Sequence, residues 1–195
     1  MLNLIKSRRS TRKYQDKMIR DEDLAMILEA GIYAPSGGNS QSNHFIVIRN
    51  KSVLEGLNRL VVDCFKKMDV TEGMYKSKVN SIVKSKAGNY VFYYNAPVLV
   101  VVCNKIDYSN NMADSCIAIE NMMLMANGLD LGSCFINQLT WLREDPKINL
   151  VLKQLGMEVD ETVFGAVALG YADTPDGLPV RVPLSRTGNK VTFIE

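Results

Sequence analysis

The residues best suited to chemistry form a basic cluster near the start of the sequence. Seven cations lie between positions 6 and 20, with Asp16 as the one acid among them: Lys6, Arg8, Arg9, Arg12, Lys13, Lys17 and Arg20. Guanidinium groups bind phosphate through paired hydrogen bonds, and the hydroxyls of Ser10 and Thr11 can donate to the same group. The cluster indicates a phosphate site, although a solvated basic face has the same composition. A nucleic-acid patch is a weaker interpretation, because the chain has no recognised nucleic-acid module.

A second polar group lies in the loop from Ala34 to Gln41, which follows a helical pattern. The loop concentrates amides and hydroxyls, and Gly37 and Gly38 would let a ligand approach the backbone. Taken alone, it is only a polar turn after a helix.

Other catalytic and metal-binding sets are missing. His44 is the single histidine, and its position beside a strand pattern favours a packed or surface role over catalysis. The four cysteines are isolated from one another, which argues against zinc and disulfides: Cys64, Cys103, Cys116 and Cys134. We expect them to be small buried hydrophobic residues.

Length and composition indicate one globular domain over residues 1–195, with 174–195 as an extended arm. The chain is 47% hydrophobic and 23% charged, and its net charge of +2 makes no demand for a polyanionic partner. No signal-peptide pattern follows the first residues, and no apolar run reaches the roughly 20 residues of a membrane span. The sequence therefore predicts a soluble cytoplasmic protein without a nucleic-acid or membrane partner.

Apolar periodicity predicts alternating helices and strands. The spacing predicts helices over 21–33, 53–67 (capped by Ser52) and 145–155. Strands are expected over 44–48, 98–103, 132–136 and 162–171, and the unbroken apolar run at 98–103 indicates a central strand covered on both faces. Residues 71–89 fit a helix or a loop and are expected to be the most mobile part.

Two further segments favour a dimer. Residues 113–127 form a helical pattern that is apolar on every side, so other protein must cover it, either within the monomer or across a subunit interface. The arm contains Pro175, Pro179 and Pro183 and ends in the alternating Val191–Ile194. Such a segment would be satisfied by pairing with a sheet edge of another subunit.

In combination these features resemble the FMN-dependent nitroreductase family. Its opening pattern is present as Arg8-Arg9-Ser10-x-Arg12, a helix, and then Ala-Pro-Ser-x-x-Asn-Ser-Gln at 34–41. Later landmarks follow in family order: Asn95-Ala96-Pro97, residues 127–136, residues 168–171 and Arg181-Val182-Pro183-Leu184. The resemblance spans nearly the whole chain. It implies an α+β nitroreductase-like fold, with a central mixed or antiparallel sheet surrounded by helices and a C-terminal arm exchanged in an intertwined homodimer.

The resemblance also assigns site residues. It implies that the FMN phosphate and ribityl chain are held by Arg8, Arg9, Ser10, Arg12 and Arg181. Residues expected along the flavin ring, with the Pro-Ser-Gly turn coming from the other subunit, are Pro35, Ser36, Gly37, Asn39 and Gln41. Asn89 would face the pyrimidine side, and the N5 edge would be flanked by Ile136, Asn137 and Gln138.

Three positions depart from the family pattern. Pro179 stands where a phosphate-binding lysine is frequent, so one phosphate contact is either missing or replaced by Arg186. Asn137 stands where an acid is frequent near N5, and Asn43 where an aromatic is frequent. Substrate preference is therefore expected to differ from that of better-known members.

The implied function is an FMN-dependent oxidoreductase that uses NADH or NADPH by a ping-pong mechanism to reduce a small-molecule electron acceptor such as a nitroaromatic or quinone. The flavin would carry the chemistry, and no side chain need act as acid or base. Dehalogenation, oxidation or flavin fragmentation would be alternative reactions. A non-catalytic binder of FMN or another phosphate-bearing ligand is the alternative of a different class.

Overall fold

A four-stranded antiparallel sheet forms the centre of the molecule, in a computed structural model that describes residues 1–195. Its strands are β1 (His44–Ile48), β2 (Val98–Lys105), β3 (Gly132–Ile136) and β4 (Glu161–Gly170), in the order β1-β2-β4-β3. All of the inner strand β2 is buried except Lys105. The α+β class and the central, doubly covered strand at 98–103 are thereby confirmed.

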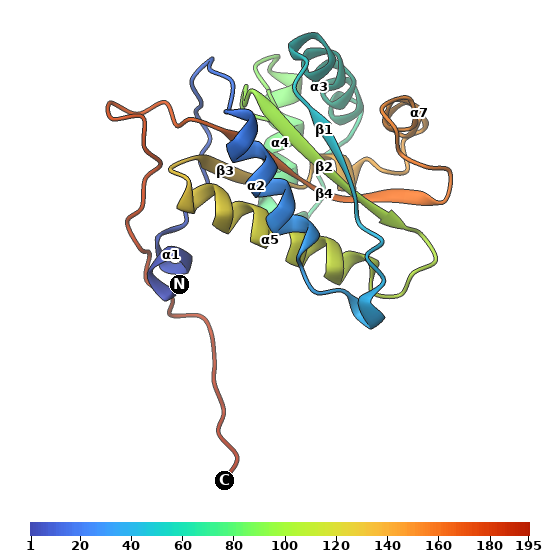
Figure 1. Cartoon of the computed structure of the whole chain (residues 1–195). Coiled ribbons are helices and arrows are strands. Elements are labelled where there is room, and N and C mark those ends of the chain that lie inside the picture. Colours follow the sequence, from blue (N-terminus) through green and yellow to red (C-terminus); the bar gives the residue numbers. More distant parts are fainter.

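Helices cover both faces of the sheet (Figure 1). One face carries α2 (Asp21–Ile32) and α5 (Asn111–Gly128), which pack against each other. The other face carries α3 (Lys51–Lys66), α4 (Lys76–Lys86), α6 (Gln138–Trp141) and α7 (Pro146–Gln154). The short helix α1 (Leu2–Ser7) contacts α5, and a single 3-10 turn, η1, spans Gly37–Asn39.

Alternation along β2 explains its unbroken apolar sequence. Successive strand side chains point to opposite faces, so each face of β2 needs its own apolar set. Leu99, Val101 and Cys103 enter the core on the α3 side. The core on the α2 and α5 side receives Val98, Val100 and Val102. Burying one large apolar side chain stabilises a fold by about 1.5–3 kcal/mol, and both faces of β2 bury several. This burial holds the sheet between the two helical layers.

Most predicted elements are confirmed to within a few residues, with two refinements. The predicted cap Ser52 was wrong, because Asn50 caps α3: its Oδ1 accepts the Val53 N–H at 3.1 Å. Residues 71–89, which the sequence left open between helix and loop, contain α4. This helix is held by the fully buried Ile82.

Helix α5 is covered only in part by the rest of its own chain. The side toward α2 and the sheet is buried, but Met112, Cys116 and Ile117 are exposed. The expectation that all four cysteines are buried is therefore wrong for Cys116, because its position on the helix faces away from the core. The other three cysteines are buried, and all four are free thiols.

The arm lies outside the body of the fold. Residues 174–195 contain no helix or strand, pass beside α1 and then run away from the sheet (Figure 1). The segment Val191–Ile194 pairs with no strand of its own chain, and Phe193 is 84% exposed. Exchange of this arm with a second copy stays a prediction.

No helix combines the length and the apolar character needed to cross a bilayer.

Candidate functional site

Residues 8–12 lie along the outer edge of β3. Ser10 forms a parallel bridge with Ser133, and the Thr11 N–H donates to the Ser133 carbonyl at 2.9 Å. This close approach requires glycine at position 132, because a Cβ there would lie 2.7 to 2.8 Å from three side-chain atoms of Thr11. The basic segment is thus fastened to the sheet, which fixes the points from which its side chains project.

Three of the predicted phosphate ligands share a neighbour, the buried thiol of Cys134. Burial raises the pKa of this thiol, while the charge of Arg12, a hydrogen bond with Ser10 and the charge of Arg8 act against the rise. The guanidinium of Arg12 also lies over the ring of Tyr94, with 5.9 Å from its central carbon to the ring centre. Arg8, Ser10 and Arg12 thus all act on one thiol, and Ser10 and Arg12 line a hollow of about 190 Å³ together with Arg9.

A basic hollow of about 550 Å³ lies between α1, α5 and the arm. Four cations line it, namely Lys6, Arg8, Arg9 and Arg186, and Glu120 is the single acid. The arm is held there because Arg9 Nε donates to the Val182 carbonyl at 2.8 Å. Cations from the two ends of the chain thus face one space, with a strong positive field.

Arg181 comes close to this cluster, but its guanidinium is engaged elsewhere. It lies 2.6 Å from the Asp130 carboxylate, and its Nε donates to Asn127 Oδ1 at 3.3 Å. Asn127 donates in turn to the Ser7 hydroxyl at 3.0 Å, directly before Arg8. Arg181 therefore reaches the start of the basic segment without lining the basic hollow.

A buried hydrogen bond joins the predicted N5 contacts to the neighbourhood of Asn89. Gln138 Nε2 donates to the Tyr90 hydroxyl at 2.7 Å, and Tyr90 follows the exposed Asn89. Gln138 is 7% exposed, and its Oε1 has no hydrogen-bond partner. Since Ile136 is also buried, the backbone of residues 136–138 and the half-buried Asn137 are the parts that can face a ligand.

The start of α5 anchors the predicted loop 34–41. Asp114, which is 4% exposed, accepts the Gly37 N–H at 3.1 Å and the Tyr108 hydroxyl at 2.7 Å. The Tyr108 hydroxyl also lies 2.9 Å from the Gly37 carbonyl, and a Cβ at position 37 would approach that hydroxyl to 2.6 Å. Sequence reasoning missed Asp114 and Tyr108; an acid within an otherwise apolar helix was the available signal.

The remainder of the loop projects outward. Ser36 Oγ accepts the Gln41 N–H at 3.1 Å, while Pro35, Asn39 and Gln41 are exposed. Asn39 and Gln41 have φ of 55° and 49°, a left-handed conformation that is rare outside glycine and asparagine. Figure 1 shows this loop and α1 near opposite ends of α5. One chain therefore does not bring the predicted ring residues of this loop to the basic segment.

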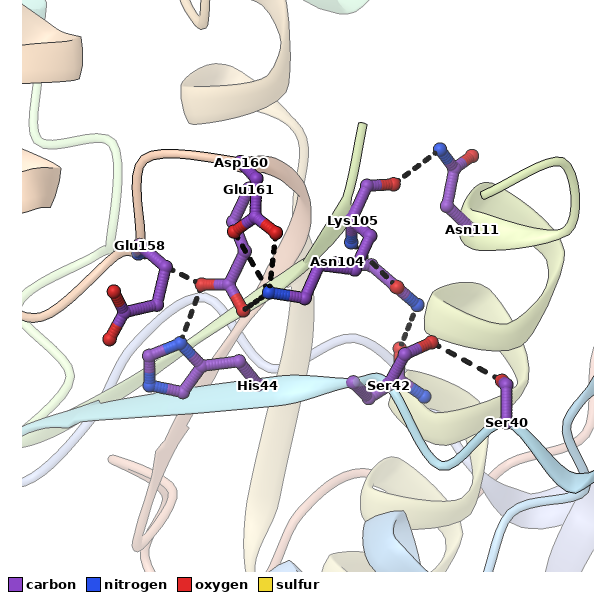
Figure 2. Close-up of polar contacts among 10 residues, drawn as sticks. Ser40, Ser42, His44, Asn104, Lys105, Asn111, Glu158, Asp160 and Glu161 are labelled. Atoms are coloured by element: carbon purple, nitrogen blue, oxygen red, sulfur yellow. Dashed lines mark hydrogen bonds and ion pairs between the residues drawn. The ribbon is translucent and has the colours of Figure 1, made fainter. Parts of the chain in front are cut away.

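His44 belongs to a separate polar cluster, which Figure 2 shows at the end of β1 and β2. Its Nδ1 lies 2.7 Å from Oε2 of Glu161, a carboxylate that is 5% exposed and also accepts the Glu158 N–H at 3.0 Å. Lys105 Nζ pairs with Asp160 at 2.8 Å in the same cluster. These contacts fit the expected packed role of His44, since the buried Glu161 needs each of its donors.

The α+β fold and the basic hollow suit a phosphate-bearing ligand. Comparisons with known proteins identify the family. The sequence profile of the Nitroreductase family matches residues 5–171. The chain is 31% identical over 175 residues, 87% of this chain and 84% of the other, to an Archaeoglobus fulgidus protein provisionally named an NADH dehydrogenase/NAD(P)H nitroreductase. The chain belongs to the nitroreductase family and is thus a member of a family of oxidoreductases.

Solved structures agree over the whole chain. A nitroreductase with bound FMN from Bacteroides fragilis is 37% identical with a TM-score of 0.86, covering 100% of this chain and 98% of that one. A nitroreductase with bound FMN from Desulfitobacterium hafniense is 26% identical with a TM-score of 0.82, covering 100% and 97%. The predicted nitroreductase-like fold is thereby confirmed.

Proposed function

We propose that this protein is an FMN-dependent oxidoreductase that uses NADH or NADPH to reduce small acceptors such as nitroaromatics and quinones. The observation that carries the proposal is the basic segment of residues 8–12 along the edge of β3, where Arg8 and Arg9 line a hollow with four cations and Ser10 and Arg12 line a neighbouring one with Arg9. The Bacteroides fragilis relative with bound FMN, similar over the full chain, supports FMN as the ligand.

The residues present fit the phosphate end of FMN. A dianionic phosphate requires several charge-assisted donors, and guanidinium groups supply these in pairs. Arg8 and Arg9 line the basic hollow, and the Ser10 hydroxyl lies close by on the same segment. Arg186 occupies the hollow from the arm and would replace the lysine absent at Pro179. The donor set is therefore complete without that lysine.

The remaining assigned residues would hold the ring. Asn89 and the backbone of residues 136–138 are kept close together by the hydrogen bond between Gln138 and Tyr90, which directly follows Asn89. FMN, when bound, would supply the hydride exchange with nicotinamide and acceptor, and this chain would supply position, charge and access.

A second copy would complete the site. Pro35, Ser36, Gly37, Asn39 and Gln41 lie near the opposite end of α5 from α1, so in the proposed homodimer they would come from the partner. The exposed apolar residues of α5, with Met112 and Ile117 among them, would be covered in the same interface. The arm, residues 174–195 of a single-domain chain, would exchange between the two copies.

An absorption spectrum of the purified protein tests the proposal. We expect a yellow protein that binds FMN and loses its flavin absorbance when NADH or NADPH is added without oxygen. A nitroaromatic or quinone should then restore the absorbance, because oxidant and reductant use one cavity in turn. A colourless protein that binds no added FMN would refute the proposal. Tight FMN binding without reduction by either nicotinamide would instead favour a non-catalytic flavin binder.

A further inference from the structure

Glu120 is the one acid in a hollow that is otherwise built from cations. It comes from α5, and its Oε1 lies 3.3 Å from Arg8 Nε. The side chains are 24% exposed for Arg8 and 41% for Glu120, so water screens the pair only in part. The carboxylate therefore pairs with one of the three arginines that line the hollow.

A phosphate group and the Glu120 carboxylate would compete for the same donor. Both are oxyanions that accept charge-assisted hydrogen bonds from a guanidinium. A phosphate that binds Arg8 must either displace Glu120 or accept its repulsion at close range. Either course makes phosphate binding weaker than the four cations alone would allow.

We propose that Glu120 is a specificity-determining residue that competes with the flavin phosphate for Arg8 and so sets how strongly the site prefers FMN over unphosphorylated riboflavin. This inference rests on the proposed function. The pair Arg181–Asp130, at 2.6 Å, shows the same arrangement at the neighbouring arginine. Asp130 is 59% exposed and outside the basic hollow, so its effect on the phosphate is weaker.

The test compares FMN and riboflavin affinities of the full-length protein and its Glu120→Gln variant, by flavin fluorescence titration at low salt. The variant is expected to bind FMN roughly three- to tenfold more tightly, because a partly screened charge is removed beside the phosphate. Riboflavin, which lacks the phosphate, should bind both proteins equally. The gain with FMN should shrink at high salt, where the repulsion is screened. Glu120→Ala should act in the same direction.

The matched control is Asp69→Asn. Asp69 pairs with Lys86 at 3.1 Å on the exposed α4 side, so this variant changes the net charge equally while leaving the basic hollow intact. It should leave the ratio of the FMN to the riboflavin affinity unchanged.

Two results would overturn the inference. Unchanged FMN affinity in both Glu120 variants would show that no competition exists, and weaker FMN binding would show that Glu120 orients Arg8 toward the phosphate. A parent protein that binds neither flavin would defeat the proposed function itself, which is a distinguishable failure. Equal unfolding midpoints for parent and variants show that the comparison is made between folded proteins.

Discussion

Arg12→Ala should weaken FMN binding by about 1.5–3 kcal/mol, the range for hydrogen bonds to charged groups. Burial lowers the pKa of Arg12, but its neighbours Cys134 and Tyr94 raise it by more, so the guanidinium keeps its charge at any working pH. Its position over the Tyr94 ring restricts the guanidinium beside the basic segment. Removing it takes one fixed positive charge from the proposed flavin site.

FMN affinity is measured by fluorescence titration at fixed ionic strength. The free energy of unfolding is measured for the same proteins. Arg12 forms no ion pair with an acid, so the fold should be nearly unaffected. Lys153→Ala, at an exposed position in the last turn of α7, removes the same charge and should leave FMN binding unchanged. Equal FMN affinities for the Arg12→Ala variant and the parent would contradict the assignment of Arg12.

Gly132→Ala should reduce FMN affinity about 5- to 160-fold, the equivalent of the roughly 1–3 kcal/mol expected for forced overpacking. The added Cβ would lie 2.8 Å from the Cβ of Thr11, an atom that no side-chain rotation can move. Residues 8–12 must then shift from β3, which breaks the Thr11–Ser133 hydrogen bond of 2.9 Å. The arginines would lose their common anchor while the cores on both faces of the sheet remain intact.

A double variant separates this cause from a general loss of stability. Thr11→Gly removes the clashing side chain, so Thr11→Gly combined with Gly132→Ala should recover part of the lost affinity. Gly56→Ala is the control, because the nearest atom to its added Cβ is 3.7 Å away at the flexible end of Arg59. It should leave FMN binding unchanged and stabilise α3 slightly. If the double variant recovers no FMN affinity, the packing of residues 8–12 against β3 does not determine FMN binding.

Periodicity was sufficient to predict the elements of the core. The run at 98–103 is buried on both faces because β2 supplies alternate residues to two cores, and this requirement is visible in the sequence. The Asn50 cap was missed because Asn50 and Ser52 are both good cap residues two positions apart. Short elements such as α1 and α6 carry too few apolar positions to show a period.

The candidate site was predictable only where its residues are close in sequence. Arg8, Ser10 and Arg12 lie together because one extended segment carries them along β3. Contacts such as Asp114 with Gly37 join residues 77 positions apart and leave no periodic trace. The ion pair between Arg181 and Asp130 was equally unpredictable, because it depends on the path of the arm and not on a local sequence pattern.

The central claim is that two chains together hold the flavin, and the molar mass of the FMN-loaded protein tests it most directly. Light scattering coupled to gel filtration, with the flavin absorbance recorded in the same peak, gives mass and stoichiometry at once. We expect a dimer of the 21.8 kDa chain that carries one FMN per chain. A monomer that retains a full equivalent of FMN would contradict a site built from two copies.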